Sequence, residues 1–194
     1  PLRRDVWGEV TGLVVCKRDG KPTLEGELRI HMTFSPQSLL AQIVLNDVNV
    51  YGLEQHFDGT KTAAVDIDLP EQETAPGLFE FGIAPSDISF AFIYWNFVEE
   101  LPRASSRWRE CRVLKLADPN GDGYVNVWFN AEHGFPMEAE WYEKNAETPW
   151  RRLEMKGAKR HANGLWFVRE MRMEGKGWKT SVRFDFAGLN AIGG

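Results

Sequence analysis

A strict alternation of apolar and polar residues in several short segments constrains this chain more than any other feature. In residues 27–34 every second residue is apolar, and the apolar set is Leu28, Ile30, Met32 and Phe34. Because successive side chains of a β-strand point to opposite faces, this pattern predicts a strand with one buried face. The same alternation predicts strands over 137–142, 152–155 and 178–186. In the last of these, a register slip of one residue would bury Lys179 and Arg183, so its pairing is well defined.

Turn-forming residues lie between these runs. Asn, Asp and Gly cluster at 18–20, 57–59, 120–123, 162–164 and 175–177. Asn and Gly adopt positive φ at low cost, as tight hairpins require. No long helical segments alternate with the strands, as a parallel α/β fold would need. The pattern therefore predicts an antiparallel up-and-down sheet for most of the chain, in a single domain spanning residues 1–194.

Residues 70–101 are the exception. Prolines interrupt this stretch, and its apolar residues do not alternate. Ser86 or Asp87 is placed to cap a short helix. Residues 88–98 are apolar nearly all round, which predicts that this segment is buried as a plug, a lid or a central strand.

Composition and charge exclude several classes of protein. The formal net charge of -5 gives no basic surface of the kind that nucleic-acid binding requires. Arginine and lysine cluster at 103–112 and 151–160, but acidic residues interrupt both stretches, which is typical of solvated strand faces. No run of apolar residues is long enough for a membrane-spanning helix.

Motifs that would carry chemistry are weak. Residues 118–123 match the first half of a calcium loop, but Phe129 stands where that loop needs a glutamate, so a hairpin turn is favoured. The histidines are far apart, and no nucleophile elbow or phosphate loop occurs. We therefore expect no catalytic residue, no metal and no cofactor. Cys16 and Cys111 either pair in an oxidising compartment or serve as small buried apolar residues.

The aromatic content leaves two interpretations open. The chain has eight Trp and twelve Phe residues, which one curved sheet with few helices has difficulty covering. These rings either fill an ordinary core or line an apolar cavity suited to acyl chains. The five methionines would suit an irregular ligand.

The order of motifs in the second half resembles that of the outer-membrane lipoprotein-sorting (LolA-like) family. A strand containing Trp128 is followed by a strand from Pro136 to Tyr142, an arginine-containing strand at 150–153 and a Gly-x-Trp strand at 164–166. Weaker matches in the first half are 26–30, 34–36, 57–59 and 82–89. The resemblance covers most of residues 5–187. One departure is that the segment 36–40 lacks the arginine that helps to gate the cavity of the best-known carrier.

The resemblance implies a mostly β fold, an incomplete antiparallel β-barrel of about eleven strands with short helices covering the open side. It also implies export to the periplasm, the signal segment being absent from this sequence. The leading hypothesis is a non-catalytic periplasmic carrier for a lipid or a lipoprotein acyl chain, with an envelope protein as a further partner. The candidate lining residues are Leu28, Ile30, Met32, Phe34, Phe90, Phe92, Trp95, Trp128, Met137, Trp141, Trp166 and Phe184.

Two rival functions remain. The first is an envelope scaffold or protein-interaction module whose barrel is filled by its own side chains. The second is an enzyme, which would need acidic, basic or nucleophilic groups converging in the cavity. The alternation instead places Glu27, Arg29, Glu138 and Glu140 on the opposite face.

Overall fold

A single open antiparallel sheet dominates the computed structural model, which describes residues 6–57, 62–66, 76–119, 121–157, 159–160 and 166–191. The sheet has 12 strands in the order β5-β4-β3-β2-β1-β14-β13-β10-β9-β8-β7-β6, so β5 and β6 are its two edges. Its first half comprises β1 (Val6–Arg18), β2 (Leu24–Phe34), β3 (Ser38–Leu45), β4 (Asn49–His56) and β5 (Thr62–Asp66). Its second half comprises β6 (Asn96–Ser106), β7 (Arg109–Ala117), β8 (Tyr124–Asn130), β9 (Pro136–Tyr142), β10 (Arg151–Lys156), β13 (Glu170–Gly175) and β14 (Trp178–Ala191). The predicted fold class, an incomplete antiparallel barrel, is confirmed.

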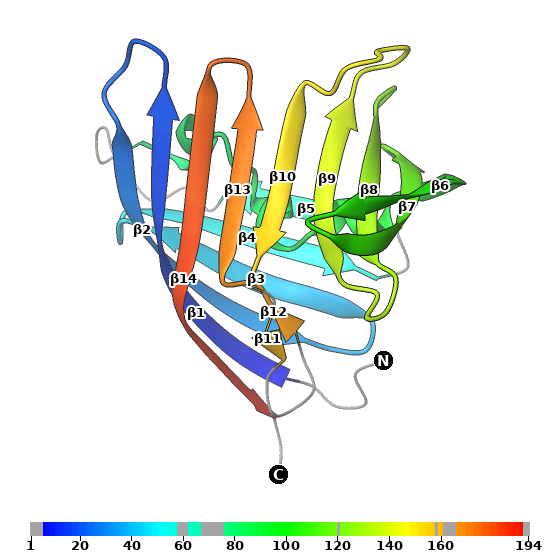
Figure 1. The fold of residues 1–194 in the computed structure, drawn as a ribbon. Helices are drawn as coiled ribbons and strands as arrows, with labels where there is room; N and C mark the ends of the chain where they lie inside the picture. The colour runs from blue at the N-terminus through cyan, green and yellow to red at the C-terminus, as the bar shows by residue number, and fades with distance from the viewer. Residues whose placement is uncertain are drawn as a thin grey trace.

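The sheet curls around its inner face. In Figure 1, β3, β4 and β5 cross behind β13, β10 and β9, and the short helices lie on the inner side. These helices are η1 (Leu78–Phe81), α1 (Pro85–Ile88) and η2 (Ala91–Tyr94). Two further strands, β11 (Lys159–Arg160) and β12 (Trp166–Phe167), form a separate two-stranded ribbon.

The alternation predicts which residues face the core. Leu28 and Ile30 are buried in β2, and Leu153 and Met155 are buried in β10, as expected. In β14 Thr180, Val182 and Phe184 are buried, and Trp178 is partly buried against the core. The β1–β14 register shifts between Thr11 and Gly12, and the side chain of Phe186, beyond this shift, lies outside the described part of the chain.

Gly12 marks a close approach between β1 and β14. A Cβ atom at this position would lie 2.3 Å from the carbonyl oxygen of Arg183. Backbone atoms cannot move aside as a flexible side chain can, so only glycine fits here.

Several predictions about the polar and buried segments need correction. Phe97 and Val98 are exposed, because they belong to the edge strand β6 and not to a buried plug. The N-cap of α1 is Ala84, and not Ser86 or Asp87 as predicted. The carboxylate of Asp87 accepts a 2.6 Å hydrogen bond from the backbone N–H of Ala84. Arg151 is not on a solvated face but is buried.

Other open questions have clear answers. Cys16 and Cys111 are both free and buried, so they act as small apolar residues. Between β7 and β8 the Asp118 N–H donates a 3.0 Å hydrogen bond to the Gly123 carbonyl, as a hairpin turn requires, and Asn120 of the predicted turn lies outside the described residues. None of the helices in the described ranges is long and apolar enough to cross a membrane.

Candidate functional site

The helical segment from α1 to η2 divides the space on the inner face of the sheet into two hollows. Ile88, Phe90 and Ile93 line one hollow, whose volume is about 500 Å³. Asp87, Phe92 and Trp95 line the other, whose volume is about 530 Å³. Along this stretch Phe90, Ile93 and Tyr94 face the first hollow, whereas Ala91, Phe92 and Trp95 face the second. A short segment therefore presents different side chains to each hollow.

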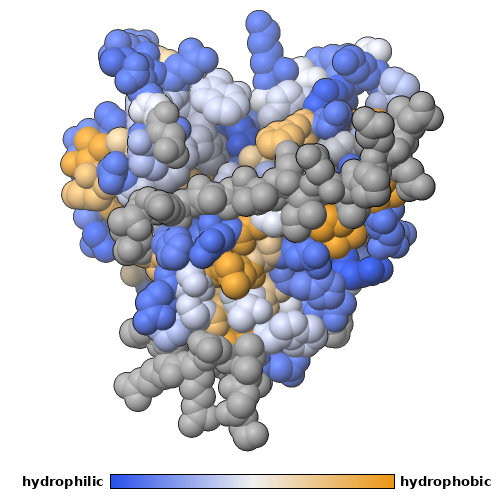
Figure 2. Space-filling model, turned by 180° about the vertical axis from the view of Figure 1, so that it is seen from behind, coloured by the Kyte–Doolittle hydropathy of each residue, from blue (hydrophilic) through white to orange (hydrophobic). Residues whose placement is uncertain are grey.

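The first hollow, which we call the apolar cavity, lies between η2 and strands β1, β2, β3, β13 and β14. Five residues predicted from the sequence line it: Ile30, Met32, Phe34, Phe90 and Phe184. Further lining residues are Val10, Leu39, Phe57, Ile93, Tyr94 and Met171. Among the described residues that line it, none carries a charged side chain. Figure 2 views the molecule from behind and shows apolar side chains at the surface in the middle of this face, bordered by hydrophilic ones.

Tyr94 is the residue in this lining whose side chain ionises. Its ring lies 5.3 Å from that of Phe57, with the two planes tilted by 31°. Burial raises the pKa of the Tyr94 phenol above its ordinary value. The hydroxyl therefore stays neutral at physiological pH and can offer a hydrogen bond to a ligand without adding charge.

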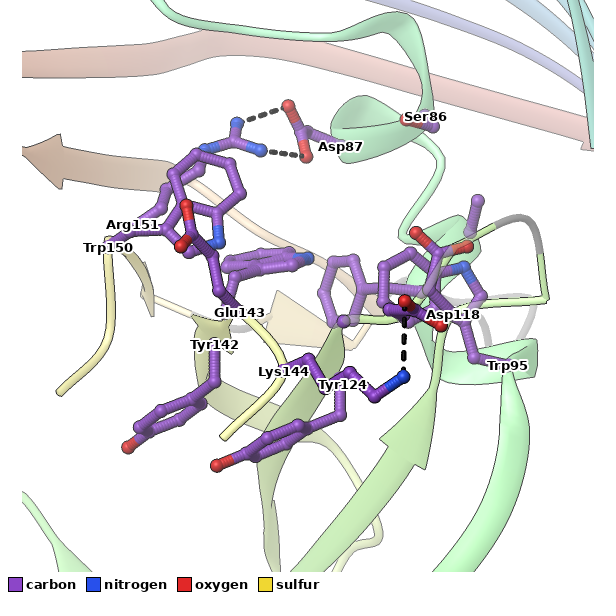
Figure 3. A pocket seen from close by; sticks show the side chains of 15 residues that line it. Ser86, Asp87, Trp95, Asp118, Tyr124, Tyr142, Glu143, Lys144, Trp150 and Arg151 are labelled. Atoms are coloured by element: carbon purple, nitrogen blue, oxygen red, sulfur yellow. Dashed lines mark hydrogen bonds and ion pairs between the residues drawn. The ribbon is translucent and has the colours of Figure 1, made fainter. Parts of the chain in front are cut away.

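The second hollow, which we call the polar hollow, is built around a buried ion pair. The Arg151 guanidinium donates to both carboxylate oxygens of Asp87, one of these bonds measuring 3.0 Å, and it also donates to the Gly82 carbonyl at 3.1 Å (Figure 3). The two side chains are only 9% and 5% exposed. Such a bidentate pair joins α1 firmly to β10.

Aromatic rings surround this ion pair. The guanidinium carbon of Arg151 lies 4.9 Å from the centre of the Trp141 ring, and Phe92 packs edge-on against Trp141 at 5.0 Å. Charged side chains reach the same hollow from loops: Asp118, Glu143 and the pair of Lys144 with Asp122, 3.2 Å apart. Tyr124 and Tyr142 contribute backbone, since their rings point away from the hollow in Figure 3.

Strands distant in sequence hold the helical segment in place. Tyr51 of β4 accepts a 3.0 Å hydrogen bond from the Leu78 N–H, and Thr180 of β14 donates to the Phe81 carbonyl. Arg18 of β1 donates to the Glu80 carbonyl. Leu78 and Phe81 are fully buried. These contacts fix η1, which leads into the partition, and the Arg151–Asp87 pair fixes α1 of the partition itself.

The other predicted lining residues whose side chains the structure describes do not line the apolar cavity. Phe92, Trp95 and Trp141 line the polar hollow. Leu28 is buried in the core and lines neither hollow. Met137 is half-buried in β9 and also lines neither. The side chain of Trp166 lies outside the described residues.

Trp128 was assigned to the cavity wrongly. It pairs with Glu138 across β8 and β9 and shares the outer face with it, while Val125 and Val127 point to the core. Glu138 itself lies on the predicted outer face, but the β6–β7 hairpin covers it, so that it is only 8% exposed.

Known structures provide an independent comparison. No family model matches this sequence, and no curated protein matches it. A domain from Vibrio parahaemolyticus, described as belonging to an outer membrane lipoprotein-sorting protein, superposes with a TM-score of 0.69 at 13% identity, covering 94% of this chain and 85% of that one. A DUF1329 family protein from Desulfovibrio piger gives 0.71 at 14% identity, covering 98% and 87%.

A LolA superfamily protein from Nitrosomonas europaea superposes with a TM-score of 0.65 at 13% identity, covering 99% of this chain and 89% of that one. The TM-scores establish the likeness of fold, while identities this low carry no ligand or partner over to this chain. The resemblance inferred from the order of motifs is confirmed at the level of structure: this chain has a LolA-like fold.

Proposed function

We propose that this chain is a non-catalytic carrier that holds an acyl chain of a lipid or a lipoprotein in the apolar cavity. The observation that supports this most is the cavity of about 500 Å³ whose described lining carries no charged side chain. Pockets for small ligands are typically of this size and mostly apolar, with few polar groups.

The energetics of such binding follow from burial. Each methylene group removed from water contributes about 0.8 kcal/mol, so ten buried methylenes contribute on the order of 8 kcal/mol before the cost of ordering the chain. Met32 and Met171 suit this task, because unbranched thioethers adapt to irregular shapes. Tyr94 and Ser89 are polar groups in the lining that can orient an ester or amide next to the acyl chain.

The rest of the proposal follows from the likeness of fold. A structural neighbour is described as a lipoprotein-sorting domain, which supports a role in the envelope, in the periplasm, with residues 1–194 acting as one domain. A carrier of this kind needs no acid, base or nucleophile, and in this proposal the polar side chains of the described lining, Ser35, Ser89 and Tyr94, serve to orient the ligand.

A fluorescent fatty-acid probe tests this function. We expect saturable binding of one probe per chain, and we expect Ile93→Trp to weaken it about tenfold by filling the cavity. The matched control is Phe79→Trp, because Phe79 lies on the neighbouring helix η1 but is 61% exposed. A wild-type protein that takes up no probe would instead favour a scaffold with a self-filled interior.

A further inference from the structure

The tip of the β6–β7 hairpin has an unusual backbone. Ser106 pairs with Arg109, so Arg107 and Trp108 form a two-residue turn. Both adopt positive φ, 47° for Arg107 and 66° for Trp108. Turns of this kind favour Asn and Gly, because a side chain in the left-handed region meets steric repulsion. Strain held at a defined position points to a function for that position.

Trp108 is also fully exposed, at 100% of its reference area. An indole ring with no contact to its own protein gains none of the stabilisation that burial provides. The turn thus accepts a strained backbone in order to present a large apolar side chain to the surroundings.

The tip is nevertheless held firmly. The hairpin bends across the outer face of β8 and β9 (Figure 1). There Ser106 donates a 3.0 Å hydrogen bond to the Glu138 carboxylate. Arg107 donates to the Met155 carbonyl at 3.1 Å and to Glu154 at 3.4 Å. Trp108 is therefore a fixed projection, pre-organised for contact.

The end of the hairpin carries one positive charge that no carboxylate offsets in the described residues. Four arginines and one glutamate lie between residues 103 and 112. Arg103 pairs with Glu110, Arg107 with Glu154 and Arg112 with Glu100, whereas Arg109, next to Trp108, forms no ion pair with the residues that the structure describes. An uncompensated guanidinium beside an exposed indole is suited to an anionic surface.

We propose that this tip docks on an anionic lipid surface, with Trp108 in the headgroup layer and Arg109 against lipid phosphates. Trp is favoured at membrane interfaces, where its ring is apolar and its N–H is hydrated. A protein partner would need a broader apolar contact around the anchor, but the flanking residues Ser105, Arg107, Arg109 and Glu110 are polar. The observations therefore favour a membrane over a protein.

Vesicle co-sedimentation at low salt tests this docking. We expect the full chain to bind vesicles of equal parts phosphatidylglycerol and phosphatidylcholine, and to bind phosphatidylcholine alone more weakly. Trp108→Ser should weaken binding to the anionic vesicles about tenfold. Arg109→Gln should weaken it about fivefold and leave binding to neutral vesicles unchanged.

Two controls separate docking from folding and from the apolar cavity. Trp108→Gly relieves the strained turn, so it should unfold at a higher urea concentration than the wild type while it loses vesicle binding. Phe79→Ser, which removes another exposed aromatic ring, from η1, and Ile93→Trp, which fills the cavity, should both bind vesicles as the wild type does. Wild-type protein that stays in the supernatant, or binding that survives Trp108→Ser, would overturn the proposal.

Discussion

The two hollows on either side of α1 and η2 have similar volumes but opposite chemistry. The apolar cavity is lined by aliphatic, aromatic and thioether side chains, whereas the polar hollow contains the Arg151–Asp87 pair and further carboxylates. The same sheet face forms both, since β1 to β3 contribute apolar residues and β10 contributes Arg151. Under the proposed function the partition has two tasks: its apolar side faces the ligand, and its polar side fastens it to the sheet.

The largest effect is expected from removing the buried Arg151–Asp87 ion pair in the polar hollow. Arg151→Met leaves the Asp87 carboxylate buried without its cation, so it should lower the free energy of unfolding by about 3 kcal/mol in a urea titration. Adding Asp87→Asn should restore much of that loss. Arg112→Met, which breaks the exposed pair with Glu100, should cost far less, because solvent screens that pair. Equal losses for the two arginines would remove the fastening role assigned to the polar hollow.

The next effect comes from placing a charge in the apolar cavity. Met32→Glu should weaken fatty-acid probe binding about thirtyfold at neutral pH, because a carboxylate must be desolvated there. Binding should recover on acidification, since the introduced carboxyl becomes neutral. Thr33→Glu is the matched control, because this neighbouring residue does not line the cavity. If both variants bind the probe equally, the cavity is not the binding site.

A smaller effect should distinguish the two sides of the partition. Phe90→Leu should weaken probe binding severalfold, because Phe90 lines the apolar cavity. Phe92→Leu should instead lower the free energy of unfolding by about 1 kcal/mol through loss of the edge-on contact with Trp141, with probe affinity nearly unchanged. Probe and urea titrations of both variants measure this contrast, and identical behaviour would mean that the segment does not separate the hollows.

The smallest effect concerns pH. The pKa of Tyr94 is raised in the folded protein, so folding favours the neutral phenol. The stability that depends on the neutral phenol is complete below about pH 10 and is lost as the pH rises through the pKa that Tyr94 has in the folded state. Wild-type stability should therefore fall more steeply above about pH 10 than that of Tyr94→Phe. Urea titrations across this range measure the difference, and parallel curves would contradict it.

The alternation of inward and outward side chains along each strand predicted much of the fold. The same alternation also held information that the prediction of individual residues did not use. Arg151 has the same parity as Leu153 and Met155, which are inward residues, so its inward position followed from the pattern of β10. Trp128 has the opposite parity to Val125 and Val127, which places it outside. In both cases the identity of the side chain was given more weight than its position.

The arrangement of the helical segment was beyond prediction from the sequence. Its place depends on hydrogen bonds donated by Arg18, Thr180 and Arg151 and on one accepted by Tyr51, and these four residues lie on four different strands. No local pattern records such contacts, because each joins residues far apart in the chain. The division of the predicted lining residues between two hollows followed from this placement alone.

The central claim is that the apolar cavity holds an acyl chain, and native mass spectrometry tests it most directly. The protein would be purified from a host with a bacterial envelope, and any bound species would be extracted and identified by lipid analysis. We predict one acylated species per chain in the wild type and its loss in Ile93→Trp, with Phe79→Trp behaving as the wild type. A wild-type chain that carries no ligand and takes up no fatty-acid probe would contradict the account.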